Sequence, residues 1–191
     1  MHRLVVLALT LAAPSTAQSS CKGGIPSSEV NAFLSAHNSL RASISSGSYV
    51  AKGGRMPAAK TPIPALTWNC TIAEKAQSYA NRCIFQHSTD RNGLGENLYT
   101  YWSSATVTTS GMGKKASDSW SSEFLQYGWP GVKLTSAAFN TGIGHATQMA
   151  WAKTTSMGCG LALCQSNKQV MVVCQYNPAG NYLNQNVYEP K

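Results

Sequence analysis

Six cysteines constrain the fold of this chain more than any other feature of its sequence. They are Cys21, Cys70, Cys83, Cys159, Cys164 and Cys174. No two of them form a Cys-x-x-Cys pair, which makes a zinc site built from cysteines the weaker interpretation. An even number of cysteines in an exported chain instead predicts three disulfides, for which fifteen pairings are possible.

The N-terminus indicates that the chain is exported. A basic start, Met1-His2-Arg3, precedes the apolar residues 4–13 and small residues at positions 15 and 17. This order is typical of a secretory signal peptide, so we expect residues 1–17 to be removed and the protein to be secreted. Residues 18–191 contain no repeat or long linker and are expected to form a single domain. No apolar run reaches roughly 18 residues, so no integral membrane span is predicted.

Composition is that of a packed domain. Hydrophobic residues make up 43% of the chain and charged residues only 12%, which favours a folded core over disorder. The formal net charge of +8 would suit an anionic partner. The basic residues are scattered, however, and no known nucleic-acid-binding motif occurs, so we expect no nucleic-acid partner. We expect a monomer or a weak dimer.

Hydrophobic periodicity predicts a mixed α and β domain. Helices are expected over 27–46 and 114–125, with a second helix starting near Thr71 and a short helical turn over 142–151. A capping box from Thr71 to Glu74 would start that second helix. Residues 53–64 and 86–97 are expected to be loops. Apolar segments 157–163 and 169–176 flank a polar turn, which predicts a hairpin in a small antiparallel sheet.

Two histidines and two acids are candidates for a shared site. His87 and Glu96 flank one expected loop, Glu123 lies on the third predicted helix, and His145 opens the short helical turn. If the fold brings them together, the two imidazoles and two carboxylates could bind a divalent metal or move protons. Separate, hydrogen-bonded structural roles are the alternative. The common catalytic motifs, such as Gly-x-Ser-x-Gly and His-Glu-x-x-His, do not occur, so no enzyme class is indicated.

Two further surface features are predicted. Tyr99, Tyr101 and Trp102 precede a stretch rich in Ser, Thr and Gly. On an exposed loop they would contact lipid or a protein partner, and otherwise they would cover the sheet. Asn69 begins an Asn-Cys-Thr acceptor sequence for N-glycosylation.

Four motifs in order resemble those of the CAP superfamily, which comprises cysteine-rich secretory proteins, antigen 5 and plant pathogenesis-related 1 proteins. They are His-Asn-x-x-Arg at 37–41, Gly-Glu-Asn-Leu at 95–98, Gly-His-x-Thr-Gln-x-x-Trp at 144–151, and Cys-x-Tyr-x-Pro-x-Gly-Asn at 174–181. The resemblance spans residues 29–188. It is strongest to single-domain nematode secreted proteins called activation-associated or venom-allergen-like.

The resemblance implies a three-layer α-β-α sandwich of the α+β class. It implies that the tetrad His87, Glu96, Glu123 and His145 converges in a central cavity, where His87 and His145 bind zinc or another divalent cation in some members. It also favours a disulfide between Cys159 and Cys174 and leaves the other pairings open. The chain departs from the family pattern at Ala146, which replaces a usual aromatic residue, so one cavity wall is expected to be more open.

Three functions follow from these features and the resemblance. The first is a parasite effector that binds sterols or fatty acids at Tyr99, Tyr101 and Trp102 and modulates its host. The second is a metal-dependent hydrolase in which Glu96 or Glu123 acts as the base. The third is a purely protein-binding immunomodulator that acts on a host receptor. The absence of a catalytic motif favours a binding protein over an enzyme.

Overall fold

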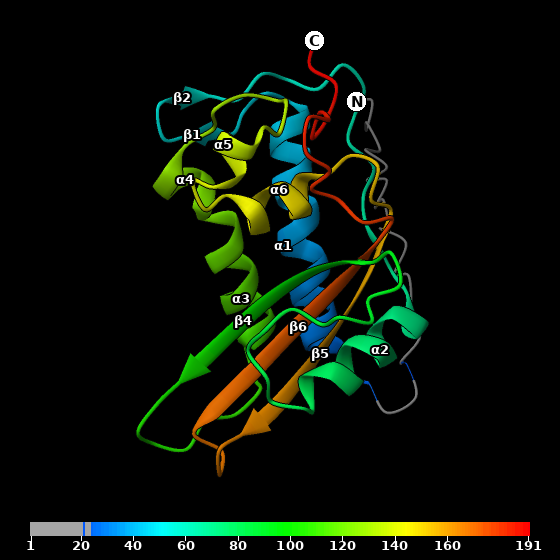
Figure 1. Cartoon of the computed structure of the whole chain (residues 1–191), viewed down its shortest axis with the longest axis vertical. Coiled ribbons are helices and arrows are strands. Elements are labelled where there is room, and N and C mark those ends of the chain that lie inside the picture. The colour runs from blue at the N-terminus through cyan, green and yellow to red at the C-terminus, as the bar shows by residue number, and fades with distance from the viewer. Residues whose placement is uncertain (1–20, 22–23) are drawn as a thin grey trace, which may run out of the picture.

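A computed structural model describes Cys21 and residues 24–191 (Figure 1). The predicted signal peptide lies outside the described residues. Within them, no helix is long and apolar enough to cross a membrane. The elements follow in the order α1 (Ser27–Ser45), β1 (Val50–Ala51), β2 (Gly54–Arg55), β3 (Thr67–Trp68), α2 (Cys70–Ala80), β4 (Gly95–Trp102), α3 (Met112–Ser121), α4 (Glu123–Tyr127), α5 (Ser136–Phe139), α6 (Gly144–Ala150), β5 (Ser156–Cys164) and β6 (Gln169–Asn177).

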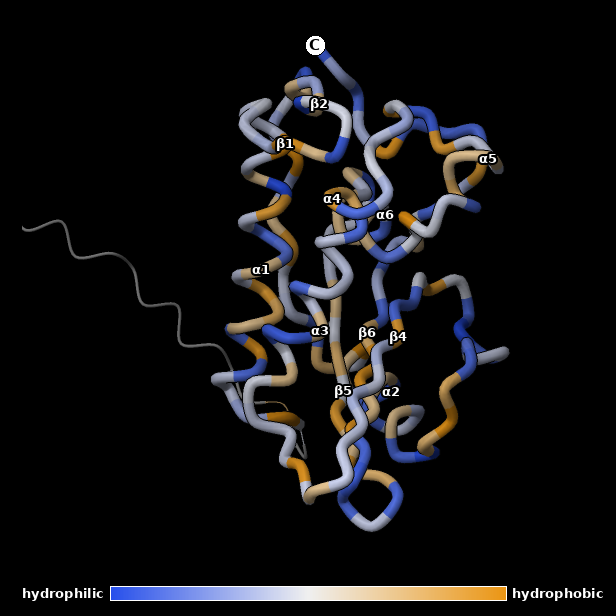
Figure 2. Tube along the Cα trace, turned by 90° about the vertical axis from the view of Figure 1, so that its left-hand side faces the viewer, coloured by the Kyte–Doolittle hydropathy of each residue, from blue (hydrophilic) through white to orange (hydrophobic). Residues whose placement is uncertain are grey.

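A four-stranded sheet, in the order β3-β5-β6-β4, forms the middle layer. Helices α1 and α3 lie on one side of it and α2 lies on the other, as the side view in Figure 2 shows. Side chains alternate between the two faces of each strand. Val170 and Val172 of β6 therefore join the core beneath α1 and α3, whereas Met171 and Val173 pack with α2. The predicted α+β, three-layer α-β-α sandwich is confirmed.

The sheet is antiparallel except at one edge. Strands β5 and β6 form the predicted hairpin, with Cys159 opposite Cys174. Strand β4 pairs antiparallel with the other edge of β6. The two-residue strand β3 pairs in parallel with β5. A strand this short has no periodicity of its own, so the sequence did not predict it.

Strand β4 begins inside a segment that the sequence predicts to be a loop. That prediction is wrong for residues 95–97, which are paired with β6 and buried. Glu96 and Asn97 look like loop residues because they are polar, but tertiary hydrogen bonds satisfy both side chains. Buried polar side chains are tolerated when they are paired in this way.

Helix α2 starts one residue earlier than predicted and uses a different cap. Asn69, not Thr71, is the N-cap, and its Oδ1 accepts a hydrogen bond of 3.2 Å from the Ile72 N–H. Asparagine is among the strongest N-cap residues. The cap leaves Nδ2 of this exposed side chain without a hydrogen bond in the described structure. Glycosylation of Asn69, which attaches to that nitrogen, stays a prediction.

The third predicted helix is two helices. Helix α3 ends at Ser121 and the short α4 begins at Glu123, where the sequence predicts one helix over residues 114–125. The break turns the chain at Ser122, so that Glu123 points toward His145, to which it is hydrogen-bonded.

The segment 53–64, which the sequence predicts to be a loop, contains the short strand β2 and is partly buried. Met56, Ala59 and Ile63 are buried in the main core. Arg41 of α1 holds the end of this segment, because its Nε donates to the Pro64 carbonyl at 2.7 Å.

The buried side chain of Arg41 joins several segments of the chain through hydrogen bonds. Besides Pro64, its guanidinium donates to the carbonyls of Met149, Trp151 and Thr154 at 2.8 to 3.0 Å. Burial lowers the pKa of Arg41 to about 10, so it stays charged at neutral pH. Its hydrogen bonds join α1 to the chain at the end of α6 and to the connection before β3.

His37 lies one turn before Arg41 and is also fully buried. Its Nδ1 donates to the Phe33 carbonyl at 2.8 Å, so its Nε2 accepts from the Tyr176 hydroxyl at 2.9 Å. Burial is the main reason that the pKa of His37 falls to about 4, and the nearby Arg41 charge lowers it further.

The protein should lose stability on acidification between pH 6.5 and 4. The unfolded chain protonates His37 near pH 6.5 and the folded one near pH 4, so the unfolded state binds more protons in this window. The contribution is complete above pH 6.5 and is lost as the pH falls, by about 3 kcal/mol in total. Urea unfolding across this range should show a shallower pH dependence for His37→Gln than for the wild type. Parallel curves would contradict the assignment.

Helix α2 lies directly on β5 because two glycines remove the side chains between them. A Cβ at Gly158 would overlap the backbone of Ala73, and a Cβ at Gly160 would overlap that of Gln77. The Gln77 amide clamps the contact, since it donates to the Leu161 carbonyl at 2.8 Å and accepts from its N–H at 3.0 Å. Any movement of α2 away from β5 would therefore break these hydrogen bonds.

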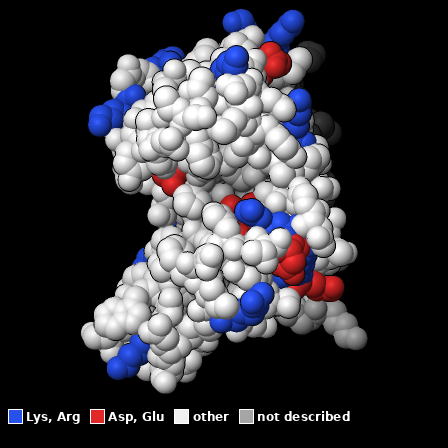
Figure 3. Space-filling view, viewed as in Figure 1, with Lys and Arg blue, Asp and Glu red and all other residues white. Residues whose placement is uncertain are grey.

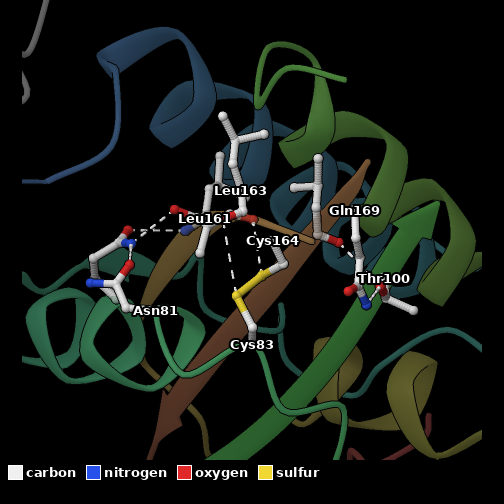
Figure 4. The surroundings of a disulfide bond; sticks show 10 residues. Asn81, Cys83, Thr100, Leu161, Leu163, Cys164 and Gln169 are labelled. Carbon is white, nitrogen blue, oxygen red and sulfur yellow. Dashed lines mark hydrogen bonds between the residues drawn. A yellow bond between two sulfur atoms is a disulfide. The ribbon is translucent and has the colours of Figure 1, made fainter. Parts of the chain in front are cut away.

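The structure contains three disulfides and leaves no free cysteine among the described residues. Cys159–Cys174 crosses the β5–β6 hairpin, in agreement with the family resemblance. The pairings that the sequence left open are Cys21–Cys70 and Cys83–Cys164. Figure 4 shows Cys83–Cys164 at the end of β5, close to the hydrogen-bonded side chains of Gln169 and Thr100. It fastens the chain just after α2 to the sheet.

Candidate functional site

The four tetrad residues line one cavity of about 250 Å³. Strand β4 supplies Glu96, the loop before it supplies His87, and α4 and α6 supply Glu123 and His145. Figure 3 shows the molecule hollowed across its middle, with acidic atoms at the upper edge and inside the hollow. Besides the tetrad, the cavity is lined by Asn97, Phe139, Gly142, Gly144 and Asn181. The fold thus brings together the residues that the sequence had scattered.

The first pair is His87 with Glu96. His87 Nδ1 donates to Glu96 Oε1 at 2.8 Å. Ser88 adds two hydrogen bonds to the same carboxylate, from its N–H and its hydroxyl, and the Gln175 amide adds another at 3.0 Å. Burial alone would raise the pKa of Glu96, but these hydrogen bonds outweigh it and lower the pKa to about 2. The carboxylate is therefore fixed and ionised, while the His87 side chain is 52% exposed toward the solvent.

The second pair is His145 with Glu123. His145 Nδ1 lies 2.5 Å from Glu123 Oε1, and the Ala146 N–H donates to Oε2 at 2.9 Å. The imidazole stacks on Trp120 at 6.1 Å between ring centroids. The indole is held in turn, because its Nε1 donates to the Leu98 carbonyl at 3.0 Å. The contact with Glu123 and the stacking on Trp120 therefore fix the orientation of the His145 ring.

The two pairs share one chemical arrangement. In each, a carboxylate engages Nδ1, which leaves Nε2 as the nitrogen available to a ligand in the cavity. Carboxylate–imidazole pairs of this kind orient histidines that bind metal ions and increase their basicity. Among the described residues, no three His, Cys, Asp or Glu side chains are arranged to hold a metal together. A cation held here would therefore have two imidazole ligands and take the rest from water or a bound molecule.

A second hollow of about 530 Å³ adjoins the tetrad cavity. The two share His87, Glu96, Phe139 and Asn181. Tyr182, with half of its surface exposed, adds an aromatic side chain to its lining. A molecule bound at the histidines would therefore have room to extend into this neighbouring space.

The aromatic residues predicted to bind lipid lie on strand β4, not on a loop. Tyr99 and Tyr101 pack against the core on the α1 and α3 side, with Lys115 Nζ over the Tyr101 ring at 3.8 Å. Trp102 alternates to the α2 side and is 61% exposed. None of the three lines the tetrad cavity. The three rings therefore do not lie on a loop or form one surface, and Tyr99 and Tyr101 instead cover the sheet, which was the alternative interpretation.

Ala146 does not open the cavity wall. Its side chain is fully buried in the main core, and its N–H holds Glu123. The expectation of a more open wall at this position is therefore not met.

Sequence reasoning missed the residues that hold Glu96. Ser88 follows His87 directly, and Gln175 lies opposite Glu96 on β6. Gln175 occupies a variable position in the fourth motif, so only the strand register reveals its partner. Asn97, by contrast, lies in the Gly-Glu-Asn-Leu motif, and its amide donates to the His145 carbonyl at 3.1 Å.

Residues 34–176 match the family model described as the cysteine-rich secretory protein family, CAP. The chain belongs to the CAP family. Among curated CAP proteins, it is 37% identical to Ancylostoma secreted protein of Ancylostoma caninum, over 86% of this chain and 40% of that protein. It is 35% identical to venom allergen 5.01 of Dolichovespula maculata, over 88% of this chain and 75% of that one. The chain thus spans less than half of the first of these relatives.

Solved CAP structures have the same fold. The structure of BmVAL-1 superposes with a TM-score of 0.85 at 35% identity and covers 91% of this chain and 88% of that one. The structure of NaASP2 with Zn²⁺ superposes with a TM-score of 0.81 at 33% identity, covering 94% and 91%. The fold and the family predicted from the four motifs are confirmed.

Proposed function

We propose that this CAP protein is a secreted binding protein that holds a divalent cation such as Zn²⁺ between His87 and His145. One observation carries the proposal: at a single cavity, two imidazoles are each held at Nδ1 by a carboxylate. Neutral imidazole nitrogens suit Zn²⁺ and related transition metals. That NaASP2, a relative of similar fold, has been solved with Zn²⁺ supports the choice of cation.

The proposed export rests on other features. Three disulfides suit an oxidising compartment, and relatives are named as a secreted protein and as venom allergens. The bound cation would fix one end of a ligand that extends into the adjoining hollow. In this proposal the protein captures its ligand and does not transform it.

The hydrolase alternative is less well supported. A general base works best when its pKa lies near the operating pH. The pKa of Glu96 is about 2, so this carboxylate is a weak base at neutral pH. Glu123 accepts hydrogen bonds with both oxygens, from His145 and from the Ala146 N–H. Both carboxylates are thus engaged in positioning the imidazoles.

Zinc should bind the mature, disulfide-bonded protein. Replacing either the histidine or the glutamate of a pair should lower the affinity for zinc. Calorimetric titration should show that His145→Gln and Glu96→Gln each bind zinc roughly tenfold more weakly than the wild type. Glu74→Gln on α2 removes an exposed carboxylate far from the cavity and should have no effect. Equal zinc affinity in all three variants would contradict the proposal.

Lipid binding is a second candidate, supported by the exposed Trp102 at the end of the sheet. Trp102 is 61% exposed, the most of any large hydrophobic side chain among the described residues. Trp102→Ser should reduce uptake of a labelled sterol or fatty acid, whereas Tyr127→Ser, another exposed aromatic substitution, should not. Unchanged uptake by Trp102→Ser would show that Trp102 is not the lipid-binding site.

A purely protein-binding effector would retain its binding to a host receptor in all of these variants.

A further inference from the structure

The C-terminal segment 182–191 brings together two basic residues that are far apart in the sequence. Lys133 is paired with Asn186 of this segment in an antiparallel bridge. A few residues farther along, the Lys60 N–H donates to the Glu189 carbonyl at 2.7 Å. Both lysines therefore lie beside one short stretch of chain, at the end of the molecule that carries β1 and β2 (Figure 1).

The side chains of both lysines point away from the core. Lys60 follows Ala59, which is buried and forms an antiparallel bridge with Pro190. Lys133 precedes Leu134, which is also buried. Because neighbours along an extended chain point to opposite sides, the burial of Ala59 and Leu134 turns the two lysines toward the solvent, where both are exposed.

A side-chain contact joins the two lysine positions into one surface. Side chains of residues directly opposite each other in an antiparallel pair lie on the same face. Asn186 is opposite Lys133, and Glu189 is opposite Lys60 in the register of the second bridge. Asn186 Nδ2 donates to both oxygens of the Glu189 carboxylate, at 3.3 and 3.2 Å. The two lysines therefore border one continuous surface.

Two more cations extend this surface. Lys153 Nζ donates to Gln185 Oε1 at 3.5 Å, beside the first bridge. Arg55 donates to the Gly47 carbonyl at 3.0 Å. Gly47 lies directly against Ala58, whose carbonyl accepts a backbone hydrogen bond from the C-terminal segment at 2.9 Å. We refer to four exposed residues as the basic surface: Arg55, Lys60, Lys133 and Lys153.

The charge of the basic surface is poorly compensated. Of the seven acidic residues in the chain, only Glu189 lies on the C-terminal segment. The other six lie on α1 to α4, on β4 or in the loop before β4. Among the described residues, no ion pair involves a member of the basic surface. Figure 3 shows several groups of basic atoms at this end of the molecule, where they create a positive potential that attracts polyanions.

We propose that the basic surface binds a sulfated polysaccharide. None of its four side chains lines the tetrad cavity or the adjoining hollow, so the surface suits an extended polyanion that lies across it and not a small anion held in a pocket. The closely spaced charges of such a polymer release counterions when cationic side chains bind them.

Export decides between the polyanions that could bind here. A secreted protein meets sulfated polysaccharides, whereas anionic lipids attract basic segments at the cytoplasmic face of a membrane. The choice of polymer thus rests on the proposed export, but it does not depend on the proposed metal site.

Binding of a heparin oligosaccharide to the mature, disulfide-bonded protein tests this proposal. A chelator is present throughout, so that the sulfates cannot bind through a metal at the histidines. The double variant Lys60→Gln/Lys133→Gln should bind heparin roughly tenfold more weakly than the wild type in calorimetric titration. The slope of log affinity against log NaCl concentration should also fall by about two, because two contacts that release counterions are lost.

A second double variant removes the same net charge elsewhere. Lys114→Gln/Lys168→Gln changes exposed lysines on α3 and in the turn between β5 and β6, and it should keep the wild-type affinity and slope. Unchanged affinity of the first double variant, or equal weakening by both, would overturn the proposal. Vesicles containing phosphatidylserine that bind as tightly as heparin would overturn it in favour of a membrane surface. A wild-type protein that binds zinc but not heparin would overturn it and leave the metal site intact.

Discussion

Replacing Arg41 with methionine should lower the free energy of unfolding by roughly 4 kcal/mol, because it removes a buried charge that pairs with four carbonyls. Methionine fills similar space but donates no hydrogen bond. The buried carbonyls of Met149, Trp151 and Thr154 and the partly exposed one of Pro64 would lose their shared donor. Urea unfolding of the oxidised protein measures the loss directly.

Two further variants show how much the Arg41 side chain contributes to stability. Arg41→Lys keeps the charge but offers a single ammonium in place of the planar guanidinium, so it should recover only part of the loss. Arg55→Met changes an exposed arginine that donates to one carbonyl, Gly47 at 3.0 Å, and should cost less than about 0.5 kcal/mol. Near-equal stability of Arg41→Met and the wild type would mean that these carbonyls find other donors.

Adding one methyl group at Gly160 should destabilise the protein by about 3 kcal/mol. Alanine at this position would normally gain up to about 1 kcal/mol, because it restricts the unfolded chain more than glycine does. Here the new Cβ meets the backbone of Gln77, which is not a flexible side-chain end. Helix α2 would have to move, and the Gln77–Leu161 hydrogen bonds would be strained.

Thermal and urea unfolding of Gly160→Ala would measure this effect. Ser156→Ala changes a half-buried position on the same strand and should stay within about 0.5 kcal/mol of the wild type. A Gly160→Ala protein as stable as the wild type would show that α2 can slide on β5. Loss of the α2 contact without loss of the sheet would appear as an earlier, separate transition.

Local sequence predicted the longer helices, the short helix α6 and the β5–β6 hairpin, but not strands β1 to β4 or the short helix α5. The apolar repeat of α1 and the hairpin of β5 and β6 depend on side chains that face the core in a regular period, and both were predicted. Strand β4 was not predicted, and at its start Glu96 and Asn97 are polar and have partners outside the strand. Ser88 is 8 residues away and Gln175 is 79. No window of sequence contains these partners together.

Convergence of the tetrad was likewise beyond local reasoning. His145 and Glu123 are 22 residues apart, and their contact depends on the break between α3 and α4. The break itself carries no proline or glycine, since Ser122 occupies it. Only the four family motifs indicated that these residues share a cavity. The aromatic residues that the sequence predicted to bind lipid show the opposite error, because alternation along a strand separates residues that are adjacent in sequence.

The three disulfides cross-link the part of the molecule that forms only one wall of the tetrad cavity. Each of them has at least one cysteine in the sheet or in α2, and Glu96 lies on the same sheet. Glu123 and His145 belong to the other half, which is joined to strand β4 by packing and by the hydrogen bonds of Asn97 to the His145 carbonyl and of Trp120 to the Leu98 carbonyl. The disulfides therefore stabilise the wall that carries Glu96 against unfolding. The opposite wall carries no disulfide among the described residues, so we expect any change in the width of the cavity to come from that half.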